Sequence, residues 1–385
     1  MRIAHIDLWR VRAPLVTPYP LSRLYGTLGH AEAVFVRLGA DDGTEGWGEA
    51  DPLQPFTAES AADVLAFLQA RAGPLLIGRP AADRARILAE IRALRPAMPT
   101  AWGAIDMALH DLGARAAGVS VAALLGGPVR DRIPVLWPLG SGSLAASVAA
   151  VETRRAEGFR TFMIKTGARD VADDARKTLR LIARYSPEIG FIADANQGWS
   201  EAEALRYVGL IGAAPLALLE QPVARNDLVG LGRVRRATEI PISADESVVS
   251  LAQAAALAAA GAVDVFSLKP SKNGGLGAAA RIAALAQGHG LGILMNSMIE
   301  FGVTQAASLQ LGLTLANLVP GGHAYMSTLR LAEDPTDFGR LVTDGWARAP
   351  AGPGLGVAVD VDHLDRLSVA HHRLGSGAAR QQALA

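Results

Sequence analysis

The sequence reads TFMIK at 161–165, GFIAD at 190–194 and LALLE at 216–220. Each of these three stretches is a short apolar run that ends in one charged residue, and segments with a helical pattern, rich in Ala and Arg, separate them. Continuous apolar runs that alternate with helices are typical of a parallel sheet buried on both faces. We therefore predict strands at these three places, joined by helical crossovers.

The same alternation continues on both sides of this region. Together the runs make about eight strand–helix units, which is the number in a (β/α) barrel with its helices on the outside. The sequence therefore predicts an α/β protein built around a barrel. The further runs are Ile133–Trp137, Ile240–Ala244, Val263–Leu268, Gly290–Met295 and a weaker one at Leu318–Pro320.

A polar residue follows each run from the second onward. Neighbouring polar residues are 24 to 29 positions apart, which is one strand–helix unit, so all of them would lie around the same mouth of the barrel. Barrel active sites are built at this C-terminal face. The residues are Lys165, Asp194, Glu220, Asp245, Lys269, Asn296 and, after the weaker run, His323.

Each of these residues taken alone has a purely structural interpretation. An Asp or Asn after a strand is more often the N-cap of the next helix, and a Lys at a strand end is usually solvated. The set is harder to explain in this way, because three carboxylates on consecutive strands repel each other unless a cation lies among them. Two lysines beside them would also be costly to remove from water without a role in the site.

Three carboxylates without Cys or His favour a hard divalent cation. Mg²⁺ prefers oxygen ligands and leaves positions open for water or substrate, and Mn²⁺ can take its place, whereas Zn²⁺ would recruit nitrogen or sulfur. An open position would accept a substrate carboxylate and neutralise the charge that forms when the α-proton leaves. The two lysines would then supply base and acid, provided that their pKa falls from its ordinary value of about 10.4.

The rest of the chain has a different pattern. Loosely alternating runs in the first 50 residues predict strands, and helical patterns follow at Thr57–Gln69 and Ala101–Ala117. We predict an α+β capping domain over residues 1–128, a barrel domain over 129–324, and a C-terminal segment over 325–385 that packs back on the capping domain. The tail from Gly375 is predicted to be frayed.

Composition excludes several classes of protein. Lys plus Arg and Asp plus Glu number 37 each, which gives no electrostatic reason to expect nucleic acid or an anionic membrane as a partner. The absence of cysteine excludes disulfides, thiolate nucleophiles and Cys-based metal sites. The N-terminus lacks an apolar signal segment, and the stretch Leu251–Val263 is too short to cross a bilayer. We expect a cytoplasmic homo-oligomer that acts on a small-molecule carboxylate.

Seven motifs spread over nearly the whole chain carry a resemblance to a known family. The chain resembles the enolase superfamily and, within it, the muconate lactonizing enzyme subgroup of the mandelate racemase/muconate lactonizing enzyme family. The resemblance implies a modified TIM barrel, (β/α)7β, with an α+β capping domain built from the N-terminal segment and the C-terminal tail. The motifs are GWGEA (46–50), AIDMA (104–108), LLGG (124–127), DANQGW (194–199), EQP (220–222), ADES (244–247) and KPSKNGG (269–275).

The resemblance also implies roles for residues in these motifs. The superfamily uses a Lys or His base, with Mg²⁺ stabilising an ene-diolate. The implied metal ligands are Asp194, Glu220 and Asp245, the implied acid/base pair on opposite faces of the substrate is Lys165 and Lys269, and the implied residues behind the ligands are Asn196 and Glu246.

Two positions depart from the subgroup pattern. The second strand usually carries Lys-x-Lys, but Met163 replaces the first Lys, which would have helped to lower the pKa of Lys165. At the eighth strand, where cycloisomerases carry a Glu and dipeptide epimerases an Asp pair, stands His323, either a packed polar residue or a substrate contact. The mandelate racemase branch needs a His after the seventh strand and an Asp after the sixth, so Asn296 and Lys269 argue against it.

The segment Tyr19–Leu28 is a candidate lid, because it is long, aromatic and contains glycine. With Phe56 it is expected to close over the barrel mouth and exclude water, although an ordinary surface loop is the alternative. Its composition suggests a partly apolar substrate, and Arg23 or His30 would meet a second anionic group. The expected substrate contacts are Tyr19, Leu21, Tyr25, Phe56, Asn296 and His323.

These observations predict a Mg²⁺-dependent isomerase that removes a proton next to a substrate carboxylate and stabilises the resulting enolate on the metal. Racemisation or epimerisation with two bases is the first expectation, and cycloisomerisation is the second. Two alternatives stay open. A syn-dehydratase of the same subgroup, a lyase, needs only one base and a leaving group, and a catalytically silent barrel would only bind a metabolite.

Overall fold

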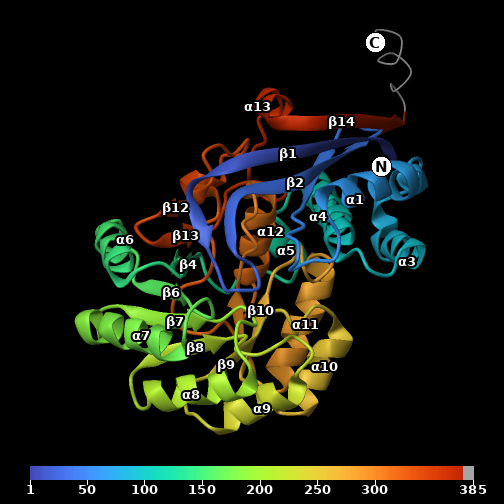
Figure 1. Cartoon of the computed structure of the whole chain (residues 1–385). Coiled ribbons are helices and arrows are strands. Elements are labelled where there is room, and N and C mark those ends of the chain that lie inside the picture. Colours follow the sequence, from blue (N-terminus) through green and yellow to red (C-terminus); the bar gives the residue numbers. More distant parts are fainter. Residues whose placement is uncertain (376–385) are drawn as a thin grey trace.

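Seven parallel strands follow one another around a barrel, each pairing with the next along the chain (Figure 1). The computed structural model describes residues 1–375, so the predicted frayed tail beyond Gly375 lies outside the described residues. The pairing is in register at the mouth, where Lys165 is opposite Asp194 and Asp194 is opposite Glu220. The strands are β5 (Leu136–Leu139), β6 (Thr161–Lys165), β7 (Gly190–Asp194), β8 (Leu216–Glu220), β9 (Ile242–Ala244), β10 (Val265–Leu268) and β11 (Gly292–Met295).

A helix follows each barrel strand. Several of these helices begin at a serine, as where the Ser200 side chain accepts from the N–H of Glu203 and the Ser250 side chain accepts from the N–H of Gln253. Such caps satisfy N–H groups that the first helical turn leaves unpaired, and so they fix where each helix begins. The helices are α6 (Leu144–Ala156), α7 (Val171–Tyr185), α8 (Glu201–Ile211), α9 (Leu228–Arg236), α10 (Leu251–Ala259), α11 (Leu276–Gly288) and α12 (Gly302–Gly312).

The residues after α12 close the barrel. Leu318 bridges to Ile293 in β11, and His323 bridges to Val135 beside β5. The predicted strand at Leu318–Pro320 is therefore wrong as a regular strand, because this segment pairs only through isolated bridges. Gly322 permits the close approach, since a Cβ there would lie 2.6 Å from the Leu136 nitrogen.

The first barrel strand begins later than predicted. The run Ile133–Trp137 divides into β4 (Arg132–Pro134) and β5, and β4 pairs antiparallel with β13 (Trp346–Arg348) outside the barrel. The N–H of Val135 donates to the carbonyl of Gly345 at 2.8 Å, and the regular pairing of β5 with β6 begins only at Leu136. The sequence could not show this, because both halves of the run are equally apolar.

A four-stranded antiparallel sheet, in the order β14–β1–β2–β3, forms the core of the capping domain (Figure 1). Helix α4 (Pro99–Ala116) packs on β3 so closely that a Cβ at Gly48 would lie 1.9 Å from the Ala104 carbonyl oxygen, which explains the glycine in the GWGEA motif. The strands are β1 (Ile3–Pro20), β2 (Thr27–Ala40), β3 (Glu45–Ala50) and β14 (Ser368–Gly375), and the other helices are α1 (Ala61–Phe67), π-helical η1 (Leu68–Ala72), α2 (Gly73–Leu76), 3₁₀-helical η2 (Ala81–Asp83), α3 (Arg84–Leu94) and α5 (Val121–Leu124).

The end of the described chain returns to this sheet. Strand β14 pairs antiparallel with β1, and Trp9 Nε1 donates to Asp365 Oδ1 of α13 (Val361–Leu367) at 2.6 Å. The architecture is the predicted modified TIM barrel with an α+β capping domain. None of the helices in residues 1–375 combines the length and hydropathy needed to cross a bilayer. The short elements between barrel and tail are η3 (Thr328–Arg330), η4 (Phe338–Leu341) and β12 (Val342–Thr343).

Strands β1 and β2 form a hairpin whose turn reaches the barrel mouth. The predicted lid segment Tyr19–Leu28 is not one long loop, because β1 ends at Pro20 and β2 begins at Thr27. The turn is anchored to the barrel: Ser22 Oγ donates to the Asn196 carbonyl at 3.1 Å, and the N–H of Arg23 donates to the Gly167 carbonyl at 3.1 Å. The two strands thus hold the aromatic segment of the sequence over the mouth.

Candidate active site

Five charged side chains from five neighbouring strands are buried at the mouth, under the hairpin. None of them is more than 8% exposed. Burial of charge is costly unless the groups are paired or bind a metal, so these positions demand a partner. The residues are Lys165 at the end of β6, Asp194 at the end of β7, Glu220 at the end of β8, Asp245 after β9 and Lys269 after β10.

A cavity of about 50 Å³ lies at this mouth. Four of the five charged residues line it, while Glu220 does not. Residues of the hairpin and of the barrel both line the cavity. Among the lining residues are Tyr25 and Phe56, whose ring centroids lie 6.0 Å apart. Of the six predicted substrate contacts, the five that line the cavity are Tyr19, Leu21, Tyr25, Phe56 and Asn296.

Lys165 is paired with a predicted metal ligand. Its Nζ donates to Asp194 Oδ2 in a short, buried ion pair. Burial alone would lower the pKa of Lys165, but Asp194, with smaller contributions from Tyr19 and Glu220, raises it well above the ordinary value. As long as this pair persists, Lys165 is protonated and cannot act as a base.

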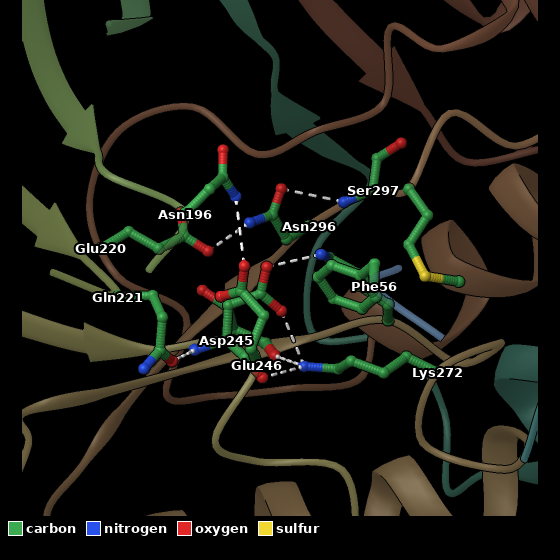
Figure 2. Close-up of polar contacts among 12 residues, drawn as sticks. Phe56, Asn196, Glu220, Gln221, Asp245, Glu246, Lys272, Asn296 and Ser297 are labelled. Atoms are coloured by element: carbon green, nitrogen blue, oxygen red, sulfur yellow. Dashed lines mark hydrogen bonds and ion pairs between the residues drawn. The ribbon is translucent and has the colours of Figure 1, made fainter. Parts of the chain in front are cut away.

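Lys269 is paired in the same way on the other side. Its Nζ donates to Asp245 Oδ2 at 2.5 Å, and it lies 4.2 Å from the centroid of the Phe56 ring. Burial would lower the pKa of Lys269, but Asp245 and two further carboxylates raise it. Asp245 also accepts from Lys272, a contact drawn in Figure 2. The Nζ of Lys272 lies 2.8 Å from Oδ1 of Asp245. Two ammonium groups therefore share one carboxylate.

Glu220 has no cationic hydrogen-bond partner within residues 1–375. Asn296 Nδ2 donates to Oε1 at 2.6 Å, and Figure 2 shows Asn296 between Glu220 and Ser297. Oε2 is buried without a hydrogen-bond partner among the described residues. Burial, followed by repulsion from Asp194 and Asp245, raises the pKa of Glu220 well above its ordinary value. This carboxylate would be stabilised by a cation between it and its neighbours.

The carboxylates are not arranged as a finished metal site. Within residues 1–375, no group of three acidic or histidine side chains is positioned to hold a metal ion as it stands, because the two aspartates point oxygens at lysines. Among the predicted metal ligands and the residues behind them, three buried oxygens nevertheless lack a hydrogen-bond donor in the described chain: Glu220 Oε2, Asn196 Oδ1 and Glu246 Oε2. An oxygen-only donor set with unsatisfied oxygens fits a hard divalent cation.

Residues behind the carboxylates hold them in place. The N–H of Asn196 donates to Asp194 Oδ1 at 2.9 Å, and Tyr25 Oη donates to Glu246 Oε1 at 3.0 Å. Gln221, which belongs to the EQP motif but was given no role from the sequence, accepts at Oε1 from the N–H of Asp245 at 2.9 Å. Asn196 and Gln221 have positive φ values of 42° and 34°, so the backbone turns sharply where these residues leave the strands.

Family models and sequence relatives of this chain belong to the same enzyme family that its motifs resemble. The enolase C-terminal domain-like family model matches residues 146–363, and the mandelate racemase/muconate lactonizing enzyme N-terminal domain model matches residues 6–126. Muconate cycloisomerase 1-2 of Acinetobacter lwoffii is 32% identical over 95% of each chain. The chain belongs to the mandelate racemase/muconate lactonizing enzyme family.

Two solved structures of this kind have the same fold over almost their whole length. The 2-chloromuconate cycloisomerase of Rhodococcus opacus shares 33% identity, with a TM-score of 0.91 over 96% of this chain and 100% of that one. The N-succinyl Arg/Lys racemase of Bacillus cereus shares 26% identity, with a TM-score of 0.92 over 97% and 100%. The chain is thus a metal-dependent isomerase of the muconate lactonizing enzyme subgroup, as predicted, and these relatives do not favour the dehydratase or the silent barrel.

Met163 and His323, where this family member departs from the subgroup, lie in different surroundings. Met163 lines the cavity beside Lys165. His323 does not: its Nδ1 accepts from the N–H of Met295 at 3.0 Å, and its Nε2 lies 3.3 Å from the Val319 carbonyl. Burial lowers the pKa of His323 to about 4. Both ring nitrogens face backbone groups, Nδ1 toward β11 and Nε2 toward the closing segment, which favours the packed polar interpretation.

One charged cavity residue was missed, and the two cations predicted to meet a second anionic group lie elsewhere. Arg330, in η3, lines the cavity, but it follows the part of the sequence where the strand–helix rhythm ends, so no local signal marked it. Arg23 instead pairs with Glu203 at 2.8 Å on the surface, and His30 is exposed on β2. Neither reaches the cavity.

Proposed function

We propose that the chain is a Mg²⁺-dependent isomerase that transfers a proton at the carbon next to a substrate carboxylate. Asp194, Glu220 and Asp245 would hold the ion, and Lys165 and Lys269 would act as acid and base. The observation that carries the proposal is the pairing at the cavity, where each lysine donates to one of the proposed ligands. A bound Mg²⁺ would neutralise the charge that develops on the substrate carboxylate.

The chain's own residues link ion binding to proton transfer. The carboxylates that keep Lys165 and Lys269 protonated, Asp194 and Asp245, are two of the three proposed ligands of the ion. A lysine that loses its carboxylate partner inside a buried site has a lower pKa, because burial disfavours the charged form. The aromatic walls from Tyr19, Tyr25 and Phe56 would exclude water from the reacting carbon.

Two lysines at one cavity favour a two-base reaction. Racemisation or epimerisation needs one group to remove the proton and another to return it from the opposite face, and both lysines line the cavity. Cycloisomerisation is the second candidate, supported by the muconate and chloromuconate cycloisomerases among the relatives. The cytoplasmic location, the homo-oligomeric state and the domain boundaries stay predictions.

The test is solvent-deuterium exchange at the α-carbon across a library of carboxylates, which includes muconate and N-succinyl amino acids, with and without Mg²⁺. We expect label in at least one compound, and only with the ion present. A protein that labels nothing with Mg²⁺ or Mn²⁺ would be a silent barrel. Label with loss of a β-substituent would instead make it a dehydratase.

A further inference from the structure

Among residues 1–375, one cation at the active-site cavity has no anionic partner. The charged residues that line the cavity are two aspartates and three cations. Each aspartate forms an ion pair with one lysine, Asp194 with Lys165 and Asp245 with Lys269. Among the described residues, Arg330 is the lining cation that is left without an ion pair.

Arg330 is fixed in position but not neutralised. Its guanidinium carbon lies 3.7 Å from the centroid of the Tyr19 ring, and the Tyr19 side chain is also a hydrogen-bond partner of Arg330. A guanidinium carries several N–H donors in a fixed plane, so these contacts with Tyr19 do not use all of them. Nη1 is buried and has no hydrogen-bond partner within residues 1–375. A buried, unpaired donor on a charged group is costly, so a ligand that supplies acceptors would bind there favourably. The planar fork of a guanidinium matches a carboxylate.

Arg330 stands where the cavity meets a larger groove of about 500 Å³. Tyr19, Pro138 and Arg330 line both spaces. No Asp or Glu of the described chain lines the groove, and its other cation, Arg154, is already paired with Glu157 at 2.6 Å. A substrate held in the cavity by one carboxylate can therefore extend past Arg330 without meeting a negative charge.

We propose that Arg330 is a specificity-determining residue that binds a second carboxylate of the substrate, remote from the reacting carbon. The substrate class is then a dicarboxylate whose far end reaches the junction between cavity and groove. This inference rests on the proposed function, since the first carboxylate is the one next to the transferred proton. It also assigns to Arg330 the role that the sequence suggested for Arg23 or His30, which lie outside the cavity.

The test compares ligands that differ only in the far charge. Isothermal titration in Mg²⁺ would use glutarate, adipate and pimelate, each beside its own monoamide. We expect the best dicarboxylate to bind at least tenfold more tightly than its monoamide, beyond the twofold statistical advantage of a symmetric diacid. Arg330→Gln should remove this preference while the Kd of the monoamide stays within twofold. Arg154→Gln, the matched control, should leave the preference unchanged.

Several outcomes overturn the proposal. The wild-type protein could bind each dicarboxylate no better than its monoamide, Arg330→Gln could weaken both ligands equally, or Arg154→Gln could remove the preference as fully as Arg330→Gln. If Arg330→Gln does not fold, Arg330→Lys replaces it and should bind the best dicarboxylate at least threefold more weakly; equal binding rejects the proposal. Titration needs no turnover, so failure of the proposed function would show separately, as absence of deuterium exchange.

Discussion

Lys165 and Lys269 occupy corresponding places on two barrel strands, but their surroundings differ. Lys269 shares Asp245 with a second ammonium, that of Lys272, which also donates to the carbonyl oxygens of Asp245 and Ser267 at 2.7 and 2.9 Å. Within the described residues, Lys165 is the one cation that forms an ion pair with Asp194, which also accepts from the N–H of Asn196. The residue two positions before Lys165 is Met163, an uncharged neighbour in the cavity wall. One side of the cavity thus keeps a fixed like charge beside its lysine, and the other has lost it.

This difference shows which interactions set the pKa of each lysine. On the Lys269 side, Lys272 is held by three acceptors and supplies repulsion that does not depend on the substrate. On the Lys165 side the main charged partner is Asp194, and the next contact is the Tyr19 ring, 5.9 Å away on the hairpin. The pKa of Lys165 should therefore depend more strongly than that of Lys269 on the bound ion and on the position of the hairpin.

The largest expected effect is the removal of either lysine. Lys165→Ala and Lys269→Ala should each reduce racemisation by about 10³-fold, because each removes one of the two proposed proton-transfer groups. Each variant should still exchange the α-proton of one enantiomer with solvent deuterium, and the two variants should label opposite enantiomers. Label in the same enantiomer, or exchange of both at wild-type rates, would show that the lysines do not work from opposite faces.

Loss of the carboxylate between the two sides should come next. Glu220→Gln removes the buried anion whose Oε2 has no donor in the described chain, so Mg²⁺ affinity should fall by more than about 100-fold, beyond the loss typical of a supporting residue. The measurement is the rise in melting temperature on adding Mg²⁺, which should disappear in the variant. The matched control is Glu201→Gln on the surface, where the carboxylate pairs with Arg233 at 3.1 Å. A normal Mg²⁺ response in Glu220→Gln would contradict the ligand assignment.

Met163→Lys should make the surroundings of Lys165 resemble those of Lys269, because each lysine would then have a second ammonium group nearby. A second ammonium near Lys165 would lower the pKa of that base by repulsion, so the acid limb of the pH–rate profile should move down by roughly one pH unit. Met163→Leu is the control, with a similar volume and no charge. Thermal melts must accompany the kinetics, because a buried unpaired ammonium costs several kcal/mol. A folded Met163→Lys enzyme with an unmoved profile would show that the bound ion alone sets the pKa of Lys165.

The charged strand ends could be predicted because their signal is local. In β6, β7 and β8 the apolar run and the charged residue after it are adjacent in sequence, and the strands end at Lys165, Asp194 and Glu220 as expected. The parallel register then brings these residues to one mouth without further information.

Features that depend on distant partners could not be predicted in this way. Arg330 reaches the cavity by stacking on Tyr19, a residue from the other end of the chain. The division of the first predicted strand depends on the hydrogen bond from the N–H of Val135 to the carbonyl of Gly345. These two residues are far apart in the chain, and no sequence pattern indicates that they pair. The ion pairs between lysines and proposed ligands were also missed, since side-chain partners within the ring are chosen by packing and not by spacing.

The smallest expected effect on activity is that of His323, on the segment that closes the barrel beside the Lys165 side. His323→Leu should leave substrate affinity unchanged and reduce the free energy of unfolding by about 1–3 kcal/mol at pH 8, because the N–H of Met295 loses its acceptor. The native pKa of about 4 lies below the ordinary 6.5, so the unfolded chain takes up a proton first as the pH falls. The contribution of neutral His323 to the stability of the wild type is therefore complete above about pH 6.5 and is lost as the pH falls from 6.5 to 4. The difference in melting temperature between the wild type and His323→Leu should become smaller over this pH range. His30→Leu, at an exposed position on β2, should show no such narrowing. If His323→Leu kept its melting temperature and lost affinity for the substrate, His323 would be a substrate contact and the packed role would be wrong.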